Sequence, residues 1–186
     1  MNRKRCQRQL EIIGRGDHEE IMAYIAKNSL YSAEQVAFIQ RGDHEEIMAY
    51  IAKNSLYGAA QVAFIQRGDH EEIMSYISQY SFDDGAAEKA LIEHGDHDEI
   101  LNYVSRYPLD EAAEKALIQR GNHDEIMAYV TTNPLSDETA QVALIRRADH
   151  NEIMVYVTDY SLCRDAEKAL YARGNQTEIM VYKARH

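Results

Sequence analysis

The chain has 186 residues and a formal net charge of -11, from 31 acidic and 20 basic side chains. This balance argues against binding to nucleic acid or to an anionic membrane, because both depend on clustered Lys and Arg. With two cysteines, no long apolar run and no secretory signal between Cys6 and Gly14, the sequence also argues against a disulfide framework and a membrane span, and we expect a soluble, cytoplasmic protein.

A four-residue turn recurs along the whole chain, first as Arg15-Gly16-Asp17-His18. Successive turns are 26 residues apart, except at two places where the spacing is 27 residues. The seven turns are centred on Gly16, Gly42, Gly68, Gly95, Gly121, Ala148 and Gly174. A fixed period in this range is typical of a repeat array, in which one unit cannot bury its apolar face alone. We expect the glycines to take the left-handed conformation that ends a helix.

The first half of each unit follows the turn and has helical periodicity. After Asp17, the residues Ile21, Tyr24 and Ile25 lie on one face of an amphipathic helix, which we expect to end near Ser29. Asp17 is placed to cap this helix, and Glu20, three residues later, would complete a capping box. The same Asp and Glu pair recurs in later repeats.

The second half of each unit is a further helix, expected from about Ser32 to Arg41. Its third position holds Glu34 here and a small residue later, which lets a neighbouring helix come close. These small residues are Ala60, Ala87, Ala113, Ala140 and Ala166. The sequence therefore predicts an all-α fold: an α-solenoid of about seven two-helix repeats, one domain over residues 1–186, with a right-handed superhelix and a core of Ile, Met, Tyr and Leu columns.

One column of histidines invites a functional interpretation. It consists of His18, His44, His70, His97, His123 and His150. A ladder of imidazoles can bind metal or respond to pH, and both stay open as alternatives. Because histidines one repeat apart, at roughly 8 to 10 Å, do not converge on one ion without further ligands, we favour a packing role with a hydrogen bond to an adjacent turn, and we assign no metal site.

A second column consists of tyrosines, and it favours packing over ligand binding. Its members are Tyr24, Tyr50, Tyr76, Tyr103, Tyr129, Tyr156 and Tyr182. We expect each ring at the edge of the core, with its hydroxyl reaching water or a carbonyl group.

The paired short helices at fixed spacing resemble the α-solenoid families, such as HEAT, armadillo and tetratricopeptide arrays, although the 26-residue unit is shorter. This resemblance implies a scaffold that binds a protein or peptide along an extended face, and the net charge favours a basic partner. The segment Ser32-Ala33-Glu34-Gln35-Val36 is similar to the opening of the DNA-reading repeats of TAL effectors, so a nucleic-acid-binding array stays as an alternative that the acidic charge opposes.

No nucleophile with a base, no phosphate loop and no singular carboxylate pair is present, so we expect no enzyme, no catalytic residue and no cofactor. Positions that vary between repeats are the expected contacts with a partner, and we name them the partner-contact stripe. The stripe consists of Glu19, Lys27, Glu45, Lys53, Glu71, Gln79, Asp98, Arg106, Asp124, Thr132, Asn151 and Asp159.

Overall fold

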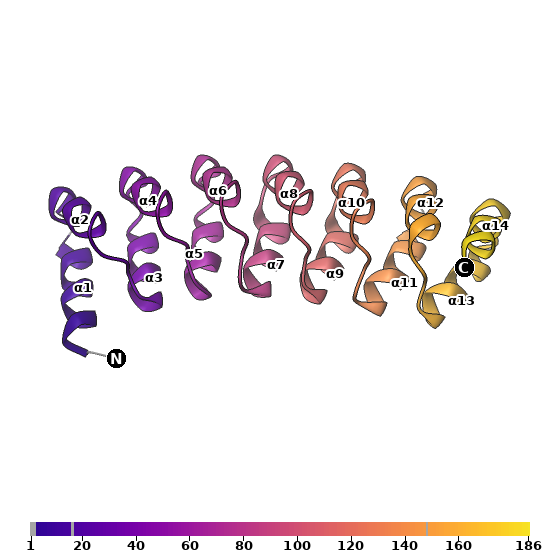
Figure 1. The fold of residues 1–186 in the computed structure, drawn as a ribbon, viewed down its shortest axis with the longest axis horizontal. Coiled ribbons are helices and arrows are strands. Elements are labelled where there is room, and N and C mark those ends of the chain that lie inside the picture. The colour runs from indigo at the N-terminus through magenta and orange to yellow at the C-terminus, as the bar shows by residue number, and fades with distance from the viewer. Residues whose placement is uncertain (1–2, 16, 148) are drawn as a thin grey trace. The chain divides into compact units, whose positions relative to one another are not determined.

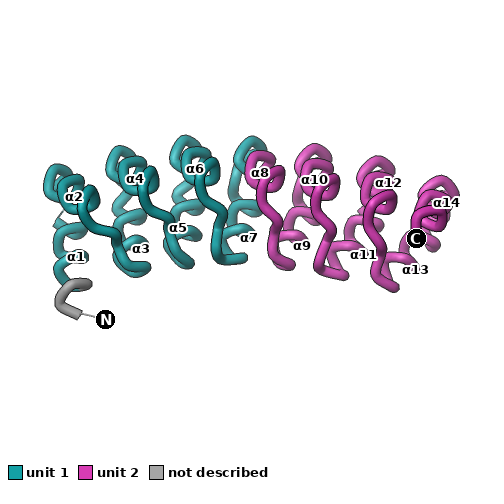
Figure 2. Tube along the Cα trace, in the orientation of Figure 1, with its two compact units in different colours: residues 1–99 teal, residues 100–186 magenta. Residues whose placement is uncertain are grey.

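A computed structural model of the protein describes residues 3–15, 17–147 and 149–186. These residues form fourteen helices and no strand, which confirms the all-α prediction (Figure 1). The chain divides into two compact units, Met1–Glu99 and Ile100–His186, and each is described here by itself (Figure 2).

The helices alternate along the chain between two kinds, which correspond to the two halves of the predicted repeat. The odd-numbered helices are α1 (Arg3–Arg15), α3 (Ser32–Arg41), α5 (Ala59–Arg67), α7 (Gly85–His94), α9 (Glu111–Arg120), α11 (Glu138–Arg147) and α13 (Arg164–Arg173). The even-numbered helices are α2 (His18–Ile25), α4 (His44–Ile51), α6 (His70–Ile77), α8 (His97–Val104), α10 (His123–Val130), α12 (His150–Asp159) and α14 (Gln176–Arg185).

Each unit contains two layers of helices, because helices of one kind pack on the next helix of the same kind. In Met1–Glu99, α3 packs between α1 and α5, α5 packs on α7, and α4 packs between α2 and α6. In Ile100–His186, α11 packs between α9 and α13, and α12 packs between α10 and α14. This repeated side-by-side packing is the arrangement expected of helical repeats. The handedness of the superhelix stays a prediction.

The isoleucine column forms the core, as expected. Ile21, Ile47 and Ile126 are fully buried, and Ile179 in the last repeat is 9% exposed. The expected methionine contribution is smaller than predicted, because the methionines from Met22 to Met154 are only partly buried and Met180 is 68% exposed. Methionine lies on the flank of the even-numbered helices, one residue after the buried isoleucine, except in α8, where Leu101 takes its place.

The capping aspartates behave as predicted, but most of the expected capping boxes are incomplete. Asp17, Asp43 and Asp69 each accept a hydrogen bond from the backbone N–H three residues later. The reciprocal bond, in which the glutamate carboxylate accepts from the backbone N–H of the capping residue, forms at Asn122 with Glu125 and at Asp96 with Glu99. In α4 and α6 the glutamate carboxylate instead faces an arginine and a histidine.

The glycine prediction is correct in some repeats and wrong in others. Gly42, Gly68 and Gly174 end their helices in the left-handed conformation, with φ of 79°, 72° and 75°. Gly95 and Gly121 are extended instead, and each donates its N–H to the helix over a distance of 2.7 Å. At both positions a Cβ atom would lie 2.6 Å from a leucine carbonyl oxygen, so glycine is needed for close approach. Gly16 and Ala148 lie outside the described residues.

The helix expected to run from Asp17 to about Ser29 is shorter than predicted. α2 ends at Ile25, and Asn28 then donates a side-chain hydrogen bond to the carbonyl oxygen of Tyr24, 3.0 Å away. Because this asparagine satisfies a terminal carbonyl group, the chain leaves the helix one turn before Ser29. Asn54 makes the same bond to Tyr50 after α4.

Candidate functional site

The partner-contact stripe is exposed in the six repeats that contribute to it. All twelve of its residues are solvent-accessible, either in the first turn of an even-numbered helix or at its carboxyl end. Two of them also contact the preceding repeat, because Glu45 lies 3.7 Å from Nε2 of His18 and Glu71 lies 3.8 Å from Nε2 of His44. The stripe is therefore available to a partner, and whether it binds one stays a prediction.

The tyrosine column lies deeper than expected and does not present rings to a ligand. Tyr50, Tyr76, Tyr103, Tyr129 and Tyr156 are at most 1% exposed. The hydroxyl groups of Tyr50 and Tyr156 accept hydrogen bonds from the loop that follows the preceding even-numbered helix: Leu30 N–H donates to Tyr50 over 3.0 Å, and Leu135 N–H donates to Tyr156 over the same distance. Burial raises the pKa of Tyr156 to about 12, although the bond from Leu135 partly offsets it.

A column of buried Gln and Glu side chains, which repeat periodicity did not single out, bonds to several of these tyrosines and to the neighbouring loops. Gln61 is 1% exposed, and its amide group donates to the carbonyl oxygen of Leu56 and to the hydroxyl of Tyr76. Glu114, at the same position of α9, accepts hydrogen bonds from the hydroxyl of Tyr129 and from the backbone of Ser136 and Asp137. These side chains satisfy loop groups that would otherwise be buried without a partner.

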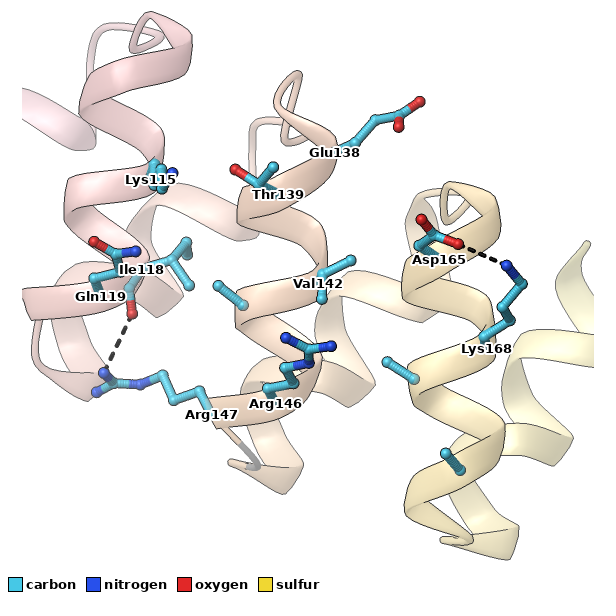
Figure 3. Close-up of a pocket in the computed structure, with 13 residues that line it drawn as sticks. Lys115, Ile118, Gln119, Glu138, Thr139, Val142, Arg146, Arg147, Asp165 and Lys168 are labelled. Carbon is cyan, nitrogen blue, oxygen red and sulfur yellow. Dashed lines mark hydrogen bonds and ion pairs between the residues drawn. The ribbon is translucent and has the colours of Figure 1, made fainter.

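A groove opens on the odd-numbered helices of the unit Ile100–His186, and we name it the α9–α11–α13 groove. Its volume is about 910 Å³. Its apolar lining consists of Ile118 from α9 and of shorter side chains from α11 and α13, and charged side chains surround it (Figure 3). The lining consists of Lys115, Ile118, Gln119, Glu138, Thr139, Val142, Ala143, Arg146, Arg147, Asp165, Lys168, Ala169 and Ala172.

The lining carries more positive than negative side chains, unlike the chain as a whole. Lys168 is paired with Asp165 at 2.7 Å, and Arg147 reaches Glu152 at 3.3 Å and the carbonyl oxygen of Ile118 at 3.4 Å. In the part of the chain that the structure describes, Arg146 is exposed and has no ion-pair or hydrogen-bond partner. The Arg146 side chain lies along α11, whereas the Arg147 side chain points towards α9 (Figure 3).

None of the groove residues belongs to the partner-contact stripe, although the sequence held a signal for one of them. The column of Arg146 contains Gln40, Gln66, Glu93, Gln119 and Ala172 in the other repeats. A single arginine among neutral and acidic residues is the kind of singular position that distinguishes one repeat from the rest. The groove itself could not be inferred, because its depth depends on how three helices pack.

The histidine column joins successive repeats, as expected, but it is more exposed than the helical pattern predicted. The side chains of His18, His44, His70 and His123 are 42%, 45%, 53% and 45% exposed. Each places its Nδ1 atom 3.0 to 3.1 Å from the buried glutamate of the next repeat. Histidine is the first residue of the even-numbered helices from α2 to α12, so its ring covers the junction from outside.

The pKa values at these junctions are shifted because buried glutamates lie beside exposed histidines. Burial raises the pKa of Glu72, and the nearby Arg67 partly offsets that effect. Burial lowers the pKa of His44, but the hydrogen bond to Glu72 and the charges of Asp69, Glu72 and Glu71 outweigh it, so the net shift is upward.

In comparisons with known proteins, no family model matched the chain, and neither a similar curated protein nor a similar solved structure was found. Within the described residues, no helix combines the length and the apolar character that crossing a bilayer requires.

Proposed function

We propose that the chain is a non-enzymatic scaffold of helical repeats that binds an extended, acidic segment of a partner protein in the α9–α11–α13 groove. The observation that carries this proposal is the groove itself, because its volume of about 910 Å³ lies within the range of ligand sites and part of its lining is apolar. Val142, Ala143 and Ala169 are short, so a peptide backbone can approach the helices closely.

The charge of the lining supports an acidic partner. Lys115, Arg146, Arg147 and Lys168 outnumber Glu138 and Asp165, and within the described residues the side chains of Lys115 and Arg146 make no hydrogen bond or ion pair. A basic partner was expected from the net charge of the chain, but the charge that a bound segment meets is that of the lining. An arginine with free donors can bind a carboxylate through two hydrogen bonds.

The test is a selection of unstructured peptides, displayed on phage, against the full chain. An enriched peptide is then synthesised with a fluorophore, and its affinity is measured by anisotropy. We expect peptides rich in Asp and Glu with small apolar residues, and we expect Arg146→Gln to weaken binding by about tenfold or more. Glutamine is suitable because Gln40, Gln66 and Gln119 occupy this column in other repeats.

The matched control is Arg106→Gln, which removes an exposed arginine of the partner-contact stripe from the same unit. It should leave the affinity unchanged. Loss of binding in Arg106→Gln but not in Arg146→Gln would overturn the groove in favour of the stripe. Enrichment of no peptide, or binding of a labelled DNA duplex at moderate salt that Arg146→Gln abolishes, would also contradict the proposal, and the second result would favour the nucleic-acid alternative.

A further inference from the structure

Four junctions between successive repeats share one constellation of side chains, and we name them the His–Asp–Glu junctions. Each combines a histidine with the capping aspartate and the buried glutamate of the next repeat, and the candidate ligand atoms of each set lie within 4.8 Å of one another. The sets are His18, Asp43 and Glu46; His44, Asp69 and Glu72; His70, Asp96 and Glu99; and His123, Asp149 and Glu152. Three lie in Met1–Glu99 and one in Ile100–His186.

From this arrangement we propose that each His–Asp–Glu junction binds one divalent transition-metal ion of the zinc class. The histidines alone do not converge on an ion, but the next repeat supplies the missing ligands. One imidazole nitrogen and two carboxylate oxygens make a three-ligand set that leaves a fourth position to water. An imidazole in the set favours zinc and its neighbours over calcium or magnesium.

The distances between the ligand atoms fit such an ion. Metal bonds of 2.0 to 2.2 Å in tetrahedral geometry place ligand atoms about 3.3 to 3.6 Å apart. At the second junction, His44 Nδ1 lies 3.0 Å from Glu72 Oε1 and 3.4 Å from Asp69 Oδ2. At the fourth, His123 Nδ1 lies 3.1 Å from Glu152 and 3.6 Å from Asp149. Small rotations of the exposed imidazole are sufficient to admit the ion.

The carboxylates are also held in place by hydrogen bonds to the oxygen that does not face the histidine, and ligands of bound metals are commonly oriented in this way. Asp69 uses Oδ1 to cap α6 and directs Oδ2 to the histidine. Glu72 receives Arg67 Nε on Oε2, 3.1 Å away, and directs Oε1 to the histidine. Glu152 is fully buried, and within the described residues its Oε2 receives an ion pair from Arg147 but no hydrogen bond. At the second junction the metal would therefore replace a histidine hydrogen bond without disturbing the cap or the arginine pair.

The chain offers a substitution that removes a ligand and keeps the fold. Asparagine caps helices about as well as aspartate, and Asn122 and Asn175 already occupy this column. Asp43→Asn, Asp69→Asn, Asp96→Asn and Asp149→Asn therefore remove one charged ligand from each junction. The matched control is Asp17→Asn, because Asp17 caps α2 in the same column but belongs to none of the four sets.

The experiment titrates the full metal-free chain with zinc chloride against a chromophoric chelator and follows thermal unfolding with and without zinc. We expect four ions per chain, a rise in melting temperature that a chelator reverses, and a loss of affinity of about tenfold or more in the fourfold Asn variant. Asp43→Asn alone should reduce the stoichiometry from four to three, and Asp17→Asn should leave it at four.

Two results would overturn the proposal. One is the absence of zinc binding by the parent chain at concentrations up to about a hundred micromolar, where a three-ligand site is expected to be filled. The other is unchanged stoichiometry and affinity in the fourfold variant, which would place the ions on other carboxylates of this acidic chain. Circular dichroism of each variant shows whether its helices are retained. Because binding is counted per junction, Asp43→Asn alone tests the proposal even if the fourfold variant is unstable.

Discussion

Glu34 is a buried carboxylate in a column where later repeats hold alanine. It is 1% exposed, and its Oε2 atom has no hydrogen-bond partner in the described part of the chain. Ala60 and Ala113, at the same position of α5 and α9, are fully buried. A buried oxygen without a hydrogen-bond partner lowers stability, so we expect Glu34 to destabilise the fold locally and a smaller side chain to remove that effect.

We expect Glu34→Ala to stabilise the protein by roughly 1 to 3 kcal/mol, because it removes an unsatisfied buried group and introduces the side chain that fits the other repeats. Urea unfolding followed by circular dichroism measures the change. Glu11→Ala, which removes an exposed carboxylate of α1, is the control and should change stability by no more than about 0.5 kcal/mol. A lower midpoint for Glu34→Ala would show that the carboxylate stabilises the α3 contacts.

The raised pKa of Tyr156 should make the stability of the protein depend on pH in alkaline solution. Its pKa of about 12 in the folded chain lies above the ordinary value of 10.0, so the folded state holds the phenolic proton more tightly than the unfolded state. The resulting contribution to stability is complete below about pH 10 and disappears as the pH rises towards 12, a loss on the order of 2 to 3 kcal/mol.

The measurement compares urea unfolding of the parent and of Tyr156→Phe at about pH 8 and about pH 11. The variant should be less stable at pH 8, because Leu135 N–H loses its 3.0 Å bond, but it should lose less stability on going to pH 11. Equal losses in both proteins would mean that the pKa of this hydroxyl is the same in the folded and unfolded states, which would contradict the prediction.

At the scale of single elements, the local sequence was sufficient to predict the even-numbered and odd-numbered helices. The expected odd-numbered element from about Ser32 to Arg41 has those bounds in α3, and arginine followed by glycine ends it. The end of α2 was placed about one turn too late, because Asn28 resembles a helix residue in the pattern but bonds back to a terminal carbonyl group.

Features that depend on contacts between repeats could not be predicted in the same way. The glutamate expected to complete a capping box, such as Glu46, has three competing partners: its own helix end, Arg41 at the end of α3 and His18 at the start of α2. Periodicity shows that these residues form columns, but not which atoms face each other across a junction 28 residues apart. The α9–α11–α13 groove and the His–Asp–Glu junctions were missed for this reason.

The conformations of the glycine column have the same origin. Gly68 and Gly95 occupy equivalent places in the sequence, yet only Gly68 has a positive φ. At Gly95 a Cβ atom would also lie 3.0 Å from the side chain of Leu91, whereas nothing lies within 4 Å of one at Gly68. The residue type permits both conformations, and the packing of the preceding helix selects one of them.

At the scale of the whole molecule, stability depends on contacts between neighbouring repeats, because helices of 8 to 13 residues are marginal by themselves. Gln61 carries such contacts: its amide donates to Leu56 over 2.9 Å and to Tyr76 over 3.3 Å, and its oxygen accepts from Asp83 over 3.3 Å. Gln61→Leu keeps the bulk of the side chain and leaves these buried groups without those bonds. We expect a cost of roughly 2 to 4 kcal/mol.

Hydrogen exchange of the full chain, followed by mass spectrometry, shows how far this cost extends. Because α5 packs on α3 and α7, protection in Gln61→Leu should fall most in α5 and next in those two helices, and it should stay unchanged in α11 and α13. Gln66→Leu, an exposed change in the same helix, is the control and should exchange like the parent. Equal loss of protection in all the helices would contradict nearest-neighbour stability, since it would require the chain to open as one cooperative unit.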